Sequence, residues 1–414
     1  MGIVRSLVLF VALSLGLSSA VLGEVQDGPL CVLDSARMPE SWQPPAELRQ
    51  TLNPAPWSQA EAEDAEHAKR RAVEEMIDYF ERHPAAVRSL WDDSIEALIQ
   101  VTYASANEPA FDARVRDAAL ENLTTLIEDH LENDALTVQC ADFPDLLPLA
   151  IFAHRLHPAG DRDTEIITKR ANDAYRACGS LAAATGNVMQ QALADEAASA
   201  SGGSGTVETS EQLENLFNLT LWAIWLTEAQ LLPDIELPAE ARAFAPAAWK
   251  YFQAYRLAGA DQFAEGARNE RFRTIADLAV HIAHIPTSVH RFPLYVEDSR
   301  ALYRFHRENF YPVMQSGDFD LLASFVDSLR QYGCTAGNDM QVRDGTRYLL
   351  RSFHDDGDRW IDDRYDSERD ASRRHYRKIH RPWTAVLGLR DRKPLQPGPG
   401  TYGGIIRRWL PPPR

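Results

Sequence analysis

Three of the twelve histidines in this 414-residue chain, His281, His284 and His290, lie within ten positions of one another. Imidazoles are common ligands of zinc and copper, and residues three apart share one face of a helix. The spacing therefore predicts a metal site in the stretch 271–295. The alternative is that these are ordinary core or surface histidines, because the chain lacks the His-Glu-x-x-His pattern of zinc proteases.

A second candidate site is the stretch 301–312, ALYRFHRENFYP, in which aromatic and basic side chains lie together. Arginine and aromatic residues are enriched at recognition surfaces. We expect the binding residues there to be Tyr303, Arg304, His306 and Arg307. The same pattern also arises where one helix face is core and the other is wet.

The stretch 354–370, HDDGDRWIDDRYDSERD, is the main acidic cluster, and its carboxylates are of the type that bind calcium. An EF-hand loop with Gly357 at its sixth position would need acids where Ser352 and His354 stand, so that motif is excluded. Salt bridges with the neighbouring arginines are the competing interpretation.

Other signatures of catalysis are missing from the sequence. It has no Gly-x-Ser-x-Gly, no phosphate-binding loop and no dinucleotide fingerprint. Aspartate and glutamate are too abundant, at 60 residues, for a catalytic pair to be singled out. The sequence therefore assigns no catalytic residue and no cofactor.

The first 23 residues have the order of a secretory signal peptide: a basic start at Arg5, an apolar run, and small residues before Glu24. A membrane anchor is the alternative, although the apolar run is short for a span. No later stretch is long and apolar enough to span a bilayer. We expect a secreted or periplasmic protein with no stable membrane insertion after cleavage.

The four cysteines, Cys31, Cys140, Cys178 and Cys334, form an even set, which predicts disulfides in an exported chain. Cys140 and Cys178 flank a predicted helical hairpin, so we favour that pair, which leaves Cys31 with Cys334. Four free buried thiols are the alternative. The cysteine spacing fits no zinc motif.

The formal net charge of −17 is unevenly distributed. Residues 364–414 hold 13 basic and 4 acidic side chains, whereas residues 24–363 hold 29 basic and 56 acidic ones. An acidic body disfavours nucleic-acid binding. The basic tail either lies on its own acidic body or binds an anionic partner.

Hydrophobic spacing indicates helices almost throughout, with hardly any alternating strand pattern. Short connections between them predict antiparallel pairs that stack. We expect an all-α fold, a HEAT-like or irregular α-α superhelix, with a closed α/α ring as the alternative. The predicted helices span about 58–82, 85–104, 110–132, 144–157, 161–194, 210–232, 238–257, 270–284, 297–315, 318–332, 339–354 and 365–379.

Composition divides the chain further. The low-complexity stretch 195–209 predicts a flexible Ser/Gly linker, or a loop within one continuous array. The expected organisation is a signal peptide (1–23), an extended Pro-rich lead-in (24–57), an N-terminal helical unit (58–194), the linker (195–209), a C-terminal helical unit (210–380) and a basic Pro/Gly-rich tail (381–414).

Two functions remain open from the sequence. The first is an exported helical-repeat protein that binds a protein or small-molecule ligand, or acts as a scaffold. The second is a metal-dependent hydrolase or lyase with its histidine site, His281, His284 and His290, in the C-terminal helical unit.

Overall fold

The structure is a computed structural model that describes residues 31, 38–105, 109–131, 138–157, 160–193, 209–230, 232, 234–237, 239–287, 289 and 294–390. These residues form helices and no strand. The predicted all-α fold of stacked helix pairs is therefore confirmed. None of the described helices has the length and apolar character needed to cross a membrane.

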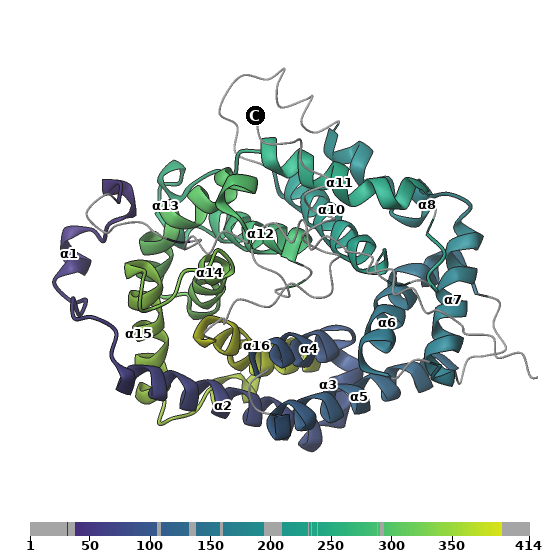
Figure 1. Cartoon of the computed structure of the whole chain (residues 1–414), viewed down its shortest axis with the longest axis horizontal. Helices are drawn as coiled ribbons and strands as arrows, with labels where there is room; N and C mark the ends of the chain where they lie inside the picture. The colour runs from purple at the N-terminus through teal and green to yellow at the C-terminus, as the bar shows by residue number, and fades with distance from the viewer. Residues whose placement is uncertain are drawn as a thin grey trace, which may run out of the picture.

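The main helices alternate along the chain between an outer and an inner layer (Figure 1). The outer helices are α2 (Gln59–Arg82), α5 (Pro109–Leu131), α7 (Arg162–Cys178), α11 (Ala239–Ala254), α13 (Arg300–Ser316) and α15 (Met340–Asp355). The inner helices are α4 (Asp93–Ser105), α6 (Phe143–Leu156), α10 (Ser210–Ala229), α12 (Glu270–Thr287), α14 (Phe319–Gln331) and α16 (Ala371–Leu389).

The last helix closes this array into a ring. On one side α16 packs against α14 and α15, and on the other it packs against α2, α3 (Pro84–Leu90) and α4 from the start of the chain. The remaining neighbours, α5 on α6, α6 on α10, α10 on α12 and α12 on α14, complete the circuit. The contacts thus follow the closed-ring form of the predicted helix stacking.

The described helices share one continuous hydrophobic core, which includes residues from both predicted helical units. The joint between those units is α6 against α10. The predicted linker between them lies almost wholly outside the described residues, which stop at Leu193 and resume at Thr209.

Local signals explain most helix boundaries. Ser58 and Glu61 form the predicted capping box, in which the Ser58 side chain accepts from the Glu61 backbone and Glu61 accepts from the Ser58 backbone. Two helices predicted as continuous are interrupted. The stretch 85–104 breaks at Trp91, whose φ of 53° ends α3, and the stretch 161–194 breaks at left-handed Gly179.

The final helix is longer than predicted. It begins at Ala371 and continues through the expected start of the tail at 381 to Leu389. Its last two turns are buried on all sides, because they lie between α14 and the first helices of the chain. Residues 391–414 of the predicted basic tail lie outside the described residues.

Both predicted disulfides are present. Cys140–Cys178 joins the start of the α6 region to the last residue of α7. Cys31–Cys334 ties a residue far upstream of α2 to the connection between α14 and α15, across 303 residues of sequence. Closing so long a loop removes much entropy from the unfolded chain in the loop-entropy view of disulfide stabilisation.

The close approach of α16 to its neighbours gives a test of ring closure. A Cβ at Gly388 would lie 2.7 Å from Leu349 Cδ1 and 3.1 Å from the Ala323 carbonyl oxygen. We expect Gly388→Ala to lower the free energy of unfolding by about 1–3 kcal/mol, since helix backbones must separate. Urea denaturation of the variant and the wild type measures this difference in the free energy of unfolding.

Gly337→Ala is the matched control, because its Cβ would meet only Thr335 Oγ1 at an ordinary 3.6 Å. Equal stability of the two variants would contradict the tight α14–α16 contact.

Candidate functional site

Helix α16 carries a row of aromatic and polar side chains on the face that contacts α14 and α4. Tyr376, Trp383 and Thr384 each lie three or four residues from His380, so they share a helix face with it. The rings of Tyr376 and His380 stack at 4.7 Å between centroids, and those of His380 and Trp383 meet edge to face at 5.9 Å. This face lies between α14 and α4, since His380 contacts Asp320 and Trp383 contacts Gln100.

Asp320, at the start of α14, holds His380 in place. Its Oδ2 lies 3.2 Å from His380 Nδ1, and its Oδ1 accepts a hydrogen bond of 3.0 Å from the Thr384 hydroxyl. A carboxylate accepts but cannot donate, so Nδ1 of His380 carries a proton. The second ring nitrogen, Nε2, is then the one that can exchange a proton with a ligand.

The His380–Asp320 dyad has opposite pKa shifts. Burial lowers the pKa of His380, but the negative charges of Asp320, Asp277 and Asp93 outweigh burial and raise it overall. Burial alone would raise the pKa of Asp320, but the charge and the hydrogen bond of His380 outweigh it and lower that pKa. Asp320 therefore stays ionised at neutral pH and favours the protonated imidazolium of its partner.

Three carboxyl groups lie at the start of α4, with Asp92 directly before the helix and Asp93 and Glu96 in its first turn. The break at Trp91 starts this helix afresh, and Asp92, Asp93 and Glu96 follow it directly. Burial, then the charges of Asp92 and Asp93, raises the pKa of Glu96 to about 8. Burial, then the charge of Asp93, raises the pKa of Asp92 to about 7. Glu96 is therefore mostly protonated at neutral pH and is a potential proton donor.

Helix α12 adds Asp277 and His281, one turn apart. The negative charge of Asp277 raises the pKa values of both His380 and Tyr376, and the charge of His281 acts on Asp93. His281 Nδ1 donates to the Asp277 backbone carbonyl at 2.9 Å. Groups from α4, α12, α14 and α16 thus influence one another across the ring interior.

Burial raises the pKa of Tyr376 strongly, with further contributions from Asp93 and Asp277, yet its side chain is 38% exposed. Asp320 is also perturbed and partly exposed, with its pKa lowered by His380 and its side chain 40% exposed. Tyr376 and Asp320 are thus influenced by neighbouring helices and are still reached by solvent. Perturbed titratable groups that are accessible to a ligand mark a candidate functional site.

Two of the three predicted metal ligands, His281 and His284, lie next to each other, and the third is not described. His281 faces the interior cluster and meets the ring of Phe217 at 5.5 Å. His284 is buried, with its ring 5.4 Å from that of His281. His290 lies outside the described residues. The structure therefore assigns one of these residues, His281, to the candidate site and says nothing of the triad as a whole.

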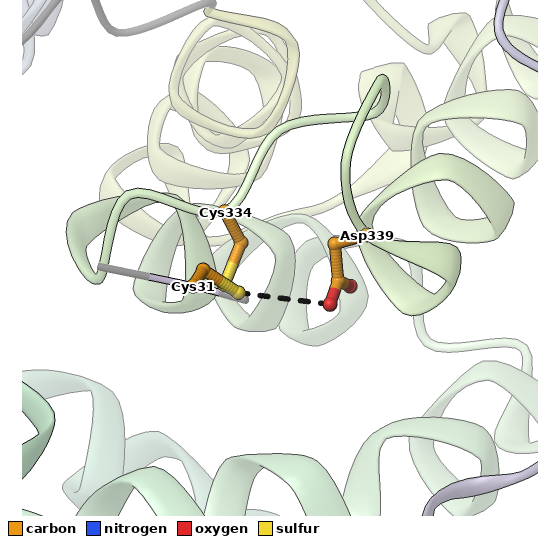
Figure 2. Close-up of side chains that lie close together, drawn as sticks. All are labelled: Cys31, Cys334 and Asp339. Atoms are coloured by element: carbon orange, nitrogen blue, oxygen red, sulfur yellow. Dashed lines mark hydrogen bonds between the residues drawn. A yellow bond between two sulfur atoms is a disulfide. The ribbon is translucent and has the colours of Figure 1, made fainter. Parts of the chain in front are cut away.

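Within the described part of the chain, one trio of cysteine, histidine or acidic side chains is close enough to share a metal ion: Cys31, Cys334 and Asp339. Figure 2 shows that the two sulfurs are bonded to each other, with Cys31 Sγ 3.6 Å from Asp339 Oδ2. A disulfide sulfur carries no proton and is not a thiolate ligand. This trio is therefore a structural contact.

The predicted binding stretch 301–312 is mostly interior. Tyr303, His306 and Arg307 are buried, and only Arg304 is exposed, where it pairs with Glu308. Burial lowers the pKa of His306 to about 4, so it is neutral at physiological pH. Helix α13 is an outer helix covered on this face by the segment around Trp42. Tyr303 and Arg307 contact that segment, so they are covered by the protein itself and do not form an open surface.

Arg307 is the centre of that buried contact. It donates to Asp339 Oδ1 at 2.9 Å and to both disulfide sulfurs, and it lies over the rings of Trp42 and Tyr303. A guanidinium with five donors can satisfy such a set without water. The aromatic and basic pattern of residues 301–312 thus includes a buried structural contact around Arg307.

The acidic stretch 354–370 is an ion-pair network. Asp356 pairs with Arg381, Asp358 with His354, and Asp363 with Arg359. The salt-bridge interpretation of this stretch accounts for these contacts.

The interior residues Asp93, Glu96, Asp320, Tyr376 and His380 were not singled out from the sequence. They lie far apart along the chain, and only ring closure brings them together. The one local signal is polar spacing on otherwise apolar helices, as at Asp93, Glu96 and Gln100 of α4.

Searches against protein-family models, curated proteins and solved structures found no match for this chain. The candidate site therefore rests on its own geometry and chemistry.

The dyad gives a test of the site. Replacing Asp320 with Asn removes the charge that raises the pKa of His380, so we expect that pKa to fall. The raised pKa stabilises the fold fully below the ordinary histidine value of about 6.5, and this stabilisation is lost as pH rises through the folded pKa. Asp320→Asn should therefore destabilise most at acidic pH.

Proton NMR of the histidine rings measures this titration. His354, which is paired with Asp64 and Asp358 on the surface, is an internal control whose titration should not change. An unchanged His380 titration in Asp320→Asn would contradict the dyad.

The buried anchor gives a second test. Arg307→Met leaves the Asp339 carboxylate without its buried cation, so we expect a loss of about 3–5 kcal/mol in the free energy of unfolding. Arg304→Ala, on the exposed side of the same helix, should cost no more than about 0.5 kcal/mol. Denaturation without reductant measures the free energy of unfolding of both variants. If Arg307 had a binding role and did not anchor the segment, the two variants would be equally stable.

Proposed function

We propose that this protein is an acid–base enzyme, a hydrolase or lyase, whose substrate binds inside the helix ring. The observation that carries the proposal is that two kinds of group meet at Tyr376: His380, which is held by the carboxylate of Asp320, stacks on its ring, and the charge of Glu96, a buried carboxyl group, acts on it. Environments that push the pKa values of neighbouring groups apart are how enzymes assign acid and base roles.

The roles follow from the protonation states. Glu96, whose pKa is about 8, is the proton donor at neutral pH. His380, in its neutral form, accepts a proton through Nε2 while Asp320 holds Nδ1. Tyr376 stacks on the imidazole and offers both a hydroxyl and an exposed ring face to a bound molecule.

An exposed apolar side chain close to the His281 contact supports ligand binding. Leu221 of α10 is 40% exposed, and it lies one turn from Phe217, which contacts His281. An apolar surface with a few convergent polar groups is the usual composition of a small-molecule site. This feature also supports the other function expected from the sequence, a binding module without catalysis.

The proposal differs from the metal-dependent enzyme expected from histidine spacing, because no step in it uses a metal ion. It keeps the expected compartment. Both disulfides fit an oxidising environment, and together with the signal-like residues 1–23 they support a secreted or periplasmic enzyme.

The test is turnover of a panel of chromogenic esters, amides and glycosides, and of neutral and acidic polysaccharides, by the mature chain. We expect one class to be converted, with a rate at least about 100-fold lower in Glu96→Gln and in His380→Asn. The rate should fall above about pH 8 as Glu96 ionises. It should also fall as pH drops through the raised pKa of His380, which lies above the ordinary value of about 6.5, because the imidazole is then protonated.

Arg304→Ala, an exposed outer-helix change, is the control and should convert the same substrate at the parent rate. Wild-type rates in Glu96→Gln and His380→Asn would place catalysis elsewhere. Binding that depends on Tyr376 without any conversion would favour the binding module instead.

A further inference from the structure

Two hydrogen bonds join α16 to the carboxyl group of Glu96. The indole Nε1 of Trp383 donates to Gln100 Oε1 at 2.8 Å, and Gln100 Nε2 donates to Glu96 Oε1 at 2.7 Å. Gln100 is 2% exposed and Trp383 is 9% exposed, so water does not compete strongly for these groups.

The chemistry of the indole fixes the direction of this chain. An indole N–H can only donate, so it must meet the carbonyl oxygen of the Gln100 amide. The amide NH₂ of Gln100 then points the other way, toward Glu96, which lies one turn earlier on the same face of α4. If the Gln100 amide were flipped, its NH₂ group would face the indole N–H of Trp383, so two donors would meet. Its carbonyl oxygen would then face the Glu96 carboxyl group.

We infer that Gln100 and Trp383 are positioning residues for Glu96, holding its Oε1 as a hydrogen-bond acceptor so that Oε2 carries the exchangeable proton. The inference rests on the proposed function for its catalytic meaning. Its geometry and its test need no substrate.

The charged groups around Glu96 also shift its pKa. Asp92 and Asp93, at the start of α4, disfavour its ionised form, whereas Arg155 on α6 favours it. The charge of Glu96 in turn acts on Tyr376 of α16. Gln100 is the neutral donor among these groups, and its hydrogen bond favours the carboxylate and lowers the pKa of Glu96.

We call the two hydrogen bonds from Trp383 through Gln100 to Glu96 the relay. The relay makes the orientation of the Glu96 carboxyl group depend on ring closure. Glu96 and Gln100 belong to the first inner helix, and Trp383 belongs to the last. The edge of Trp383 also meets His380, so one indole contacts both the proton-acceptor side and the donor side of the site. The carboxyl group is therefore oriented only when α16 is docked.

The test follows the Glu96 carboxyl by carbon NMR of the full-length folded protein labelled at the glutamate side-chain carboxyl. The Glu96 signal is the one that Glu96→Gln removes. Gln100→Leu removes the hydrogen-bond donor to the carboxylate. We therefore expect the pH midpoint of the Glu96 titration to rise by about one unit. Trp383→Phe keeps Gln100 but frees its amide, so the midpoint should move in the same direction by less.

Trp360→Phe is the matched control. It also removes a buried indole N–H, one that donates to the Ala68 carbonyl at 2.7 Å, but its indole has no contact with Glu96 or Gln100 in the described structure. We expect this variant to leave the Glu96 midpoint in place. Unchanged midpoints in both Gln100→Leu and Trp383→Phe, or an equal change in Trp360→Phe, would overturn the relay.

The outcomes separate the relay from the proposed function. If the midpoints move as expected but no substrate class is converted, the relay holds and the enzyme proposal fails. If Glu96→Gln abolishes turnover while Gln100→Leu and Trp383→Phe keep the wild-type pH–rate profile and midpoint, the enzyme proposal holds and the relay fails.

Discussion

The packing of α16 between the beginning and the end of the helical array is the interaction on which the rest of this structure depends. Each inner helix is apolar toward two neighbours, so an open array would leave a hydrophobic face uncovered at both ends. Helix α16 covers both ends at once, by contacting α14 and α15 on one side and α2, α3 and α4 on the other. Buried polar contacts fix its position, including Arg390 with Asp327 and Tyr79 with His375.

Ring closure also creates the electrostatics of the candidate site. Carboxyl groups at the start of α4 are buried in the closed ring, and burial raises the pKa values of Asp92, Asp93 and Glu96. Repulsion by neighbouring carboxylates raises the pKa values of Asp92 and Glu96 further. Asp320 escapes this effect because His380 neutralises it. Proton donor and acceptor thus arise from similar side chains in different surroundings.

Much of the fold could be predicted because its causes are local. Apolar spacing predicted the helices, the Ser58 box predicted the start of α2, and even cysteine usage with the hairpin between Cys140 and Cys178 predicted both disulfides. The break at Trp91 could not be predicted, since a bulky residue rarely adopts a positive φ. The extent of α16 was missed because tertiary packing, not local sequence, buries its last turns.

The candidate site was less predictable, because a local cluster of one residue type does not indicate which side chains on different helices come close together in the folded ring. Three clustered histidines suggested a site, yet only His281 reaches the interior group among those the structure describes. The aromatic and basic stretch around Arg307 serves as an anchor for the disulfide-linked segment. His380 and Asp320, 60 positions apart in sequence, form the dyad only in the closed fold.

The central claim is that the closed ring holds an enclosed group of carboxyls that stays partly protonated at neutral pH. Infrared spectroscopy of the folded protein measures this directly, through the carbonyl band of protonated carboxyl groups. The account predicts that the band is present at pH 7, weakens in Glu96→Gln, and disappears as pH rises through about 8. Absence of the band at pH 7 in the folded wild-type chain would contradict the account.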